Sequence, residues 1–298
     1  GEIIAKHIAS AAGGIPNNHN GSGDDATTIT SGGFGSLAAE TSTSKSFGVI
    51  WTPKFIDLSV SIDYFDIEVE NEVTLLGATN ILLGCYDSLN FASEPLCNLF
   101  TRSPAGSATQ FLVEEVTDNY LNISTQQNRG IDIDAIYKHE FNSGKLTLRG
   151  QAAYQLEDEV KLLPTSDPLD GNGRIGDPEW VGNFDATFET GPFEFFYSAR
   201  YVGETSNADN FGSQPQTYQL QPVRYVLGTD AFVYHNVSVA VEPDEGLSVR
   251  FGISNVLDEE PPFVTELSGE FNTIGNVPVV SNYDFFGRTV FLNVSKTF

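Results

Sequence analysis

Apolar and polar side chains alternate at every second position along much of the chain after about residue 40. In KLTLRGQAAYQL, Leu146, Leu148 and Tyr154 fall on one face of an extended strand, because successive side chains point to opposite faces. Thr147 and Arg149 fall on the other face. The closing segment NYDFFGRTVFLNVSKTF alternates in the same way. The pattern predicts strands that form a sheet with one apolar side and one polar side.

The alternation predicts an all-β chain of nine strands, at residues 42–52, 57–70, 125–138, 144–157, 179–190, 193–203, 228–242, 246–257 and 284–298. Short links alternate with long loops, which span 71–124, 158–178, 204–227 and 258–283. Outer-membrane barrels have short periplasmic turns and long external loops, whereas a soluble sandwich needs no such asymmetry. The spacing therefore predicts a transmembrane antiparallel up-and-down β-barrel with long extracellular loops.

Charged residues of both signs are expected on the polar face of these strands. In a barrel they would point into a polar lumen, whereas on a soluble sandwich they would be solvated. They are Asp63, Asp132, Asp134, Arg149, Asp185, Glu194, Arg200 and Arg250.

Aromatic residues fall near both ends of the predicted strands. At the short-turn end they are Trp51, Tyr137, Phe188, Phe193 and Phe298, and at the loop end Tyr64, Tyr154, Trp180, Tyr201 and Phe286. Two such levels are typical of the aromatic girdles at the two membrane interfaces. The alternative is that these rings are ordinary core aromatics. Lys296 and Arg288 lie on the apolar face near strand ends, where their side chains can reach water.

Composition narrows the function classes. The chain has 298 residues and a formal net charge of -25, which argues against nucleic acid as a partner. It contains no run of about 18 apolar residues, so a membrane-spanning helix is excluded. Its first residue is not Met and no signal-peptide pattern is present. Nine strands is an odd number, and bacterial barrels usually have an even one. We expect this chain to be part of a larger barrel.

Several stretches resemble one family, the TonB-dependent outer-membrane receptors. They include LAAETSTSKSFGVIWTP, NRGIDIDAIY, GISNVLDEEPP and the closing FGRTVFLNVSKTF, and the resemblance runs from about residue 37 to 298 in the family's order. Ala39 stands where the family usually has Pro. The resemblance implies a barrel of about 22 strands with a plugged lumen. It assigns residues 41–298 to the C-terminal part of the barrel, without the plug domain. Residues 1–40 are rich in Gly, Ser, Asn and Thr, which predicts an extracellular loop or disordered arm.

The resemblance also implies a function. Such a receptor lies in the outer membrane of a Gram-negative bacterium, in contact with its lipid, and imports a scarce small solute such as an iron chelate (a siderophore complex), a cobalamin or an oligosaccharide. A TonB-type partner supplies the energy through the plug. Other possibilities are a passive porin, an autotransporter translocator, or a non-transporting surface assembly or adhesin. No catalytic motif is present, so we expect neither an enzyme nor a cofactor.

Cys85 and Cys97, the two cysteines of the chain, both lie in the first long loop. In an oxidising envelope such a pair is expected to form a disulfide. A pair of reactive thiols or a metal site are the alternatives. The four histidines show no metal-ligand spacing.

The second long loop, DPLDGNGRIGDPEW, partly matches the spacing of a calcium loop. Asp170, Asn172 and Glu179 would be ligands at positions 3, 5 and 12. Position 1 is Pro168 and no helices flank the segment, so a turn-rich loop is the preferred interpretation.

The third long loop contains the residues that we select as solute contacts: Tyr218, Arg224 and Tyr225. Arg and aromatic residues dominate binding hot spots, although a simply solvated loop would have the same composition. The long loops are net acidic, which disfavours a strongly anionic solute.

Overall fold

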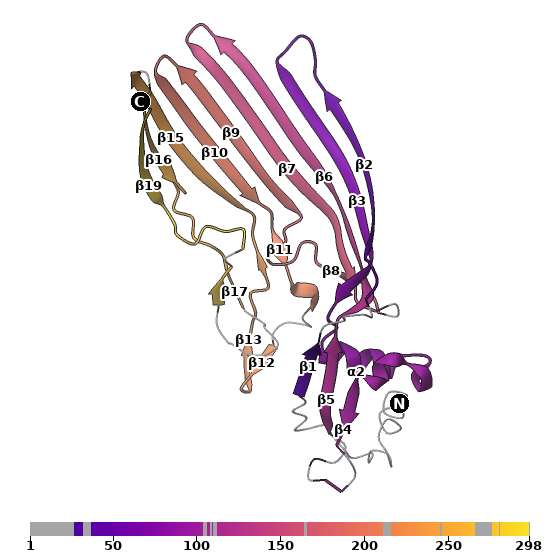
Figure 1. Cartoon of the computed structure of the whole chain (residues 1–298). Helices are drawn as coiled ribbons and strands as arrows, with labels where there is room; N and C mark the ends of the chain where they lie inside the picture. The colour runs from indigo at the N-terminus through magenta and orange to yellow at the C-terminus, as the bar shows by residue number, and fades with distance from the viewer. Residues whose placement is uncertain are drawn as a thin grey trace. The chain divides into compact units, whose positions relative to one another are not determined.

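The computed structural model describes residues 27–31, 37–103, 106–107, 109, 112–163, 166–210, 216–244, 246–265, 276–279 and 281–297. The chain forms two compact units, which are described separately below. The larger comprises residues 44–67, 128–158 and 170–298, and the smaller comprises residues 1–43, 68–127 and 159–169. Figure 1 labels their elements.

One large sheet contains nine long strands in the order of the sequence, and each lies beside the next (Figure 1). From β7 through to β19, neighbouring strands pair antiparallel. A tenth, two-residue strand, β8 (Leu169–Asp170), pairs with β7. The nine strands are β2 (Thr41–Trp51), β3 (Leu58–Thr74), β6 (Leu121–Phe141), β7 (Gly144–Lys161), β9 (Trp180–Thr190), β10 (Phe193–Val202), β15 (Phe232–Asp244), β16 (Leu247–Ser254) and β19 (Thr289–Lys296). The predicted nine strands and their up-and-down order are confirmed.

The register places one apolar row of side chains across six strands. Cross-strand partners in this row are Leu146, Phe188, Phe195, Val239, Phe251 and Leu292. Phe195, Phe251 and Leu292 are 48%, 46% and 67% exposed, and the other three are half-buried. A contiguous apolar surface of this size is typical of a face that meets lipid or a partner rather than water.

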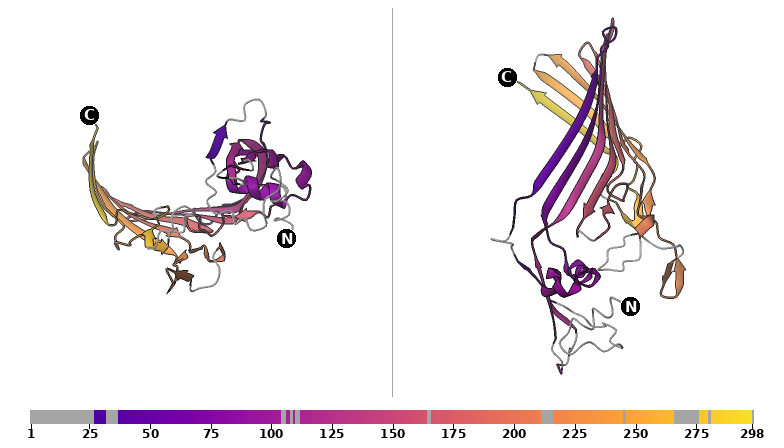
Figure 2. Two further views of the ribbon diagram at one scale, coloured as in Figure 1. Left: turned by 90° about the horizontal axis from the view of Figure 1, so that it is seen from below. Right: turned by 90° about the vertical axis from the view of Figure 1, so that its right-hand side faces the viewer.

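The adjacent row belongs to the opposite face and is polar. Its members, from β7 to β19, are Lys145, Glu189, Glu194, Ala240, Arg250 and Asn293. One step along each strand therefore leads from the apolar face of the sheet to the charged face, because side chains alternate between the two faces. Figure 2 shows the strands of this sheet following a curve.

The hairpins at one end of the strands are tight. Between β9 and β10 the loop is Gly191 and Pro192, and Gly191 has a φ of 54°. Glycine adopts this left-handed conformation without a steric penalty. The short links expected from the sequence are thus present.

The loops at the other end contain short elements of their own. β11 (Thr205–Ser206) pairs with β14 (Gly228–Thr229), and η3 (Ala208–Asn210) follows β11. β12 (Gln216–Tyr218) pairs with β13 (Gln221–Val223). β17 (Phe263–Thr265) pairs with β18 (Asn276–Pro278).

The smaller unit combines a three-stranded sheet with helices. β1 (Thr27–Ser31) is parallel to β5 (Val113–Asn119), which also pairs with β4 (Phe100–Arg102). Of the expected arm 1–40, residues 27–31 thus form a strand, and residues 1–26 and 32–36 lie outside the described residues. The helices are α2 (Ala78–Asp87), η1 (Phe91–Ser93) and η2 (Pro95–Asn98).

Helix α2 departs from the all-β expectation. Ile81 and Cys85, four residues apart on one helical face, are both fully buried and pack with Leu96 and Val116. The helix has ten residues and no side-chain cap, so the sequence carries little local signal for it. Tertiary packing stabilises such a short helix. Among the described residues, no helix has the length and apolarity needed to span a membrane.

The last strand begins later than predicted, at Thr289 rather than residue 284. Asp284 accepts a hydrogen bond from the backbone N–H of Phe286, and Gly287 has a φ of 72°. Phe286 therefore lies in a turn before β19 and is 90% exposed. Side-chain hydrogen bonding to the nearby backbone replaces the strand there.

Candidate functional site

Three long loops of the larger unit fold together over the strand ends. We call the described residues of 171–178, 203–229 and 255–288 the loop platform. Its apolar centre consists of Val202, Tyr234, Val264, Val279 and Tyr283, with Ile175 and Phe232 packed against it. Because these residues come from different loops and two strands, the loops share one small core.

A buried chain of hydroxyl groups runs through this core. Thr205 Oγ1 lies 2.7 Å from Thr229 Oγ1, which lies 2.9 Å from the Tyr283 hydroxyl. All three residues are at most 7% exposed. Buried polar groups that satisfy one another hold their backbones in one arrangement. The third and fourth long loops are thereby joined.

Backbone contacts join the loops further. Ser206 donates its N–H to the carbonyl of Gly173 at 2.8 Å, and the Asn282 amide donates to the carbonyl of Gly176 at 2.6 Å. Thr265 and Val226 exchange two hydrogen bonds of 2.9 Å. The platform is thus a connected structure rather than a set of independent loops.

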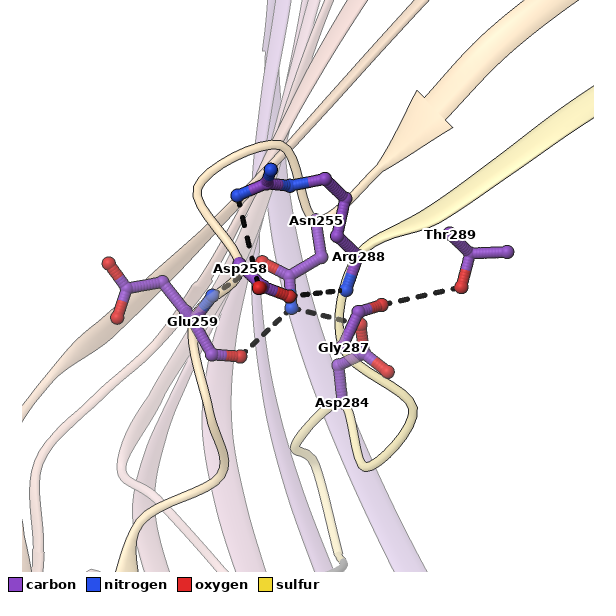
Figure 3. Close-up of polar contacts among 7 residues, drawn as sticks. All are labelled: Asn255, Asp258, Glu259, Asp284, Gly287, Arg288 and Thr289. Carbon is purple, nitrogen blue, oxygen red and sulfur yellow. Dashed lines mark hydrogen bonds and ion pairs between the residues drawn. The ribbon is translucent and has the colours of Figure 1, made fainter.

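Asn255 fixes the start of the last long loop (Figure 3). It is 1% exposed and has a φ of 52°. Its side chain accepts a hydrogen bond from the Glu259 N–H at 2.9 Å and donates to the Glu259 carbonyl at 2.9 Å and to Asp284 at 3.1 Å. Its own N–H donates to Asn236 Oδ1 at 2.9 Å. One buried amide therefore joins both ends of the loop.

Asp258 makes the neighbouring link. Its Oδ1 accepts the backbone N–H of Arg288 at 2.8 Å, and its Oδ2 lies 3.9 Å from the Arg288 guanidinium (Figure 3). A Cβ on Gly287 would lie 3.1 Å from the same carboxylate. Asn255 and Asp258 both belong to GISNVLDEEPP, the stretch with the most specific family resemblance. Their role as a loop clamp was not inferred from the sequence.

The polar face of the sheet carries ion pairs below this platform. Arg250 lies 2.7 Å from Glu194 and 3.0 Å from the Ser238 hydroxyl. Arg149 lies 3.3 Å from Asp134. The register places Asp185 opposite Arg149, so it shares that face. These residues are on the face to which the sequence assigned them.

Arg200 and Asp63, two more of the charged residues expected on the polar face, also contact residues of the sheet. The Arg200 guanidinium lies 5.1 Å from the centre of the Tyr234 ring, a cation–π distance. Asp63 occupies the space over Gly48, since a Cβ there would lie 1.9 Å from the Asp63 carboxylate. Asp63 and Asp132 line one shallow hollow of about 360 Å³ on the sheet.

The three proposed solute contacts lie on or beside the β12–β13 hairpin. Tyr218 ends β12 opposite Gln221, and Arg224 and Tyr225 follow β13. Arg224 is exposed and Tyr225 is half-buried. The structure thus puts all three into one short region of the third loop, and their contact with a solute stays a prediction.

The calcium-like loop uses its polar groups for turns. Asp170 Oδ1 accepts the backbone N–H of Asn172 at 2.9 Å and that of Asp158 at 3.4 Å. The Asn172 amide donates to the Gln155 carbonyl, and Glu179 lies over Gly173. Among the described residues, no group of three His, Cys, Asp or Glu could hold a metal ion. These contacts favour a turn-rich loop.

Cys85 of α2 and Cys97 of η2 form a disulfide, with their Cα atoms 4.9 Å apart. Cys85 is completely buried in the core of the smaller unit. The bond therefore joins two positions 12 residues apart in the sequence at that core.

Of the predicted girdle residues, Trp51, Trp180, Phe193 and Tyr201 lie at or next to a strand end. At the turn end, Phe193 and Trp51 are 46% and 55% exposed, and Phe188 lies opposite Phe195. Tyr137 stacks on His139. Tyr64 is half-buried in β3, and Phe298 lies outside the described residues.

At the loop end, Tyr154 stacks on Trp180, with ring centres 4.3 Å apart and ring planes 16° apart. Trp180 and Tyr201 are 40% and 39% exposed. The register puts Tyr154 opposite Trp180 and Tyr201 opposite Gly182, in the same face as Phe188 and Phe193. Their contact with a membrane interface stays a prediction.

Comparison with solved structures finds the same fold in larger receptors. A mutant of the ferric enterobactin receptor of Pseudomonas aeruginosa has a TM-score of 0.56 at 14% identity, over 88% of this chain and 32% of that one. The siderophore receptor PirA of Acinetobacter baumannii gives 0.53 at 15%, with the same coverage. The FrpB iron transporter of Neisseria meningitidis gives 0.51 at 14%, over 90% and 33%. The chain thus spans about a third of these receptors.

No curated protein sequence matches the chain. A family model does: the one described as TonB dependent receptor-like, beta-barrel, which matches residues 9–256. This family comprises receptors and transporters of the Gram-negative outer membrane that take small solutes such as siderophores. The match covers most of the chain, and the sheet has the order, faces and loop asymmetry of such a barrel. The chain belongs to the TonB-dependent receptor β-barrel family.

Proposed function

We propose that the chain is the C-terminal barrel part of an outer-membrane receptor that imports a scarce small solute by energy-coupled transport. The observation that carries the proposal is the loop platform, joined by the Thr205, Thr229 and Tyr283 hydroxyls, at one end of a sheet with an apolar and a charged face. The charged face would line the lumen and the apolar face would meet outer-membrane lipid. Residues 41–298 would be barrel and residues 1–40 an external segment.

The energy would come from a TonB-type partner acting through a plug domain, as is general in the family. In this arrangement the sheet is the wall of the path, and the loop platform is its outer entrance. The platform's hydrogen-bonded core supports this role, because a preorganised surface loses less entropy when it binds a solute.

An iron chelate, a cobalamin and an oligosaccharide are the solute classes that we propose. Two of the three similar receptors named above are described as siderophore or enterobactin receptors, which supports the first class. Tyr218, Arg224 and Tyr225 are the proposed contacts, since they lie together in one loop of the platform. We propose neither an enzymatic activity nor a resident cofactor.

Uptake by cells tests the proposal. The receptor that contains this chain is expressed in a Gram-negative strain lacking its own importers, and uptake of a labelled ferric siderophore, cobalamin and maltohexaose is measured. We expect uptake of one solute, and its loss when a protonophore collapses the proton gradient. Uptake that survives the protonophore would identify a passive pore instead. Surface display without uptake of any solute would identify an adhesin or assembly protein.

Substitutions in the third loop test the contacts. Arg224→Ala and Tyr225→Ala should raise the solute concentration needed for half-maximal uptake by about tenfold each, as for typical hot-spot residues. Leu220→Ala is the control, because Leu220 is 91% exposed at the tip of the same hairpin. Equal effects of all three changes would show that the hairpin, rather than these side chains, matters.

A further inference from the structure

A second cavity lies between the loop platform and the loop ends of β9 and β10, and residues of both line it. Its volume is about 800 Å³, within the range of small-molecule sites. The residues that line it include Glu179, Trp180, Tyr201, Gly203, Glu204 and Asp230. None of the residues proposed as solute contacts is among them.

Two aromatic rings form part of its wall. Tyr154 covers one face of Trp180 by stacking, and Trp180, which lines the cavity, is 40% exposed. Tyr201, on the neighbouring strand, is 39% exposed. A ring that is held from behind and open in front offers a preorganised flat surface for an apolar group.

Two glycines let the backbone segments of the wall approach each other closely. Gly203 lies against Trp180: its N–H donates to the Trp180 carbonyl at 2.8 Å, and a Cβ there would lie 2.9 Å from that oxygen and 3.3 Å from the Trp180 Cβ. Gly228 lies against Thr205, whose carbonyl would be 2.6 Å from an added Cβ. Larger residues would collide with the backbone at both positions.

The polar groups of the wall are almost all hydrogen-bond acceptors or hydroxyls. Glu179, Glu204 and Asp230 are exposed, and no Lys, Arg or His lines the cavity. An anionic ligand would find no counter-charge there. No three acidic, His or Cys side chains of the described residues lie close enough together to hold a metal ion.

We propose that this cavity binds a saccharide. A pyranose ring presents an apolar face of C–H groups, which suits the open face of Trp180, and a rim of hydroxyl donors, which suits the carboxylates. The sugar would come from a free oligosaccharide or from a glycolipid of the membrane, since Trp180 and Tyr201 share a face with the exposed Phe193 and Phe195. Binding of this kind does not require import.

Calorimetry on the purified protein tests the proposal. The protein is kept in lauryldimethylamine oxide, because glycoside detergents carry the same sugar chemistry as the ligand. The soluble probes are maltotriose and triacetylchitotriose. The lipid probes are phosphatidylcholine vesicles with and without lipopolysaccharide. Binding of a soluble probe would identify a free saccharide, and binding confined to vesicles with lipopolysaccharide would identify the lipid-linked form.

Two variants decide whether the cavity is the site. Trp180→Ala should weaken the binding at least about tenfold, as expected for the loss of one stacking ring. Trp51→Ala is the matched control, since Trp51 is the other tryptophan of the chain and is 55% exposed without lining the cavity. Glu204→Gln, at an exposed position, should weaken binding while leaving the melting temperature unchanged.

Two results would contradict the proposal. No binding of any probe, or equal effects of the Trp180 and Trp51 changes, would overturn the saccharide site. Because the measurement uses purified protein, saccharide binding without uptake in cells would overturn only the import function.

Discussion

Arg250 reaches across a whole strand to Glu194: the two residues lie on either side of Ala240 in the register, and Arg250 Nη2 is 2.7 Å from Glu194 Oε1. The small Ala240 is 5% exposed beneath them. Glu189, directly opposite Glu194, lies 3.7 Å from Lys145 on its other side. Two acidic residues thus face each other, each next to a cation. The small side chain of Ala240, on the strand between them, lets Arg250 and Glu194 pair across it.

The Arg250–Glu194 pair should contribute little to stability. Both side chains are about one-third exposed, and such pairs are typically worth about 0.2–1 kcal/mol. In a double-mutant cycle of Arg250→Gln and Glu194→Gln, measured by urea unfolding in micelles, we expect a coupling free energy in this range. A coupling above about 2 kcal/mol would instead indicate a desolvated pair.

Asn255 should contribute much more to stability than the Arg250–Glu194 pair does. Asn255→Ala removes an amide that is 1% exposed and leaves the Glu259 N–H, the Glu259 carbonyl and Asp284 without that partner, and the loss of a hydrogen bond at a buried site costs about 1–3 kcal/mol. We expect a loss of about 2–4 kcal/mol and faster proteolysis within residues 258–288. Asn255→Gly separates the causes, because glycine tolerates the φ of 52°. If Asn255→Gly were as stable as wild type, strain and not hydrogen bonding would explain the alanine result.

The disulfide should stabilise the smaller unit alone. Without reductant, mass spectrometry should give a mass lower by two hydrogens than that of the reduced chain. Cys97→Ser should destabilise the unit by about 2–4 kcal/mol, the usual range for such bonds. Limited proteolysis should then cut within residues 78–98 and spare β9 to β16. Two free thiols in the oxidised protein, or cleavage of the large sheet, would contradict this.

The predicted aromatic girdles place the two tryptophans at opposite interfaces of the membrane. Trp51 and Trp180 lie at opposite ends of their strands, so both should be near a lipid headgroup level. In vesicles, lipids brominated near the headgroup should quench each tryptophan more strongly than lipids brominated near the chain ends. Trp180→Phe and Trp51→Phe isolate the two signals. Stronger quenching from the chain ends would show that the rings are not at the interfaces.

The calcium-like loop should not bind calcium in the micromolar range. Asp170 already accepts two backbone N–H groups, and its role is to form the turn. Calorimetry with calcium chloride should show no binding, and Asp170→Ala should change only the stability. Micromolar binding that Asp170→Ala abolishes would reverse this conclusion.

Some features could be predicted from the sequence because they depend on local geometry. Phe251 and Arg250 must point to opposite faces of β16 whatever the rest of the chain does. Helix α2 and the turn at Asp284 were missed because each depends on particular contacts: burial of Ile81 in one case and a side-chain hydrogen bond to Phe286 in the other. Neither contact leaves a trace in the alternation of apolar and polar residues from which the strands were predicted.

The sequence by itself determined the nine strands, their order, their two faces and the asymmetry of their loops. These follow from a two-residue period and from loop lengths, both of which are written along the chain. Only the tertiary structure decided that Thr205, Thr229 and Tyr283 would meet, that Asn255 would join both ends of the last loop, and that Trp180 would border a cavity. Such contacts join residues far apart in the sequence, 54 positions from Thr229 to Tyr283 and 106 from Gly176 to Asn282. Their specificity comes from packing and hydrogen bonding between loops that have no periodic pattern.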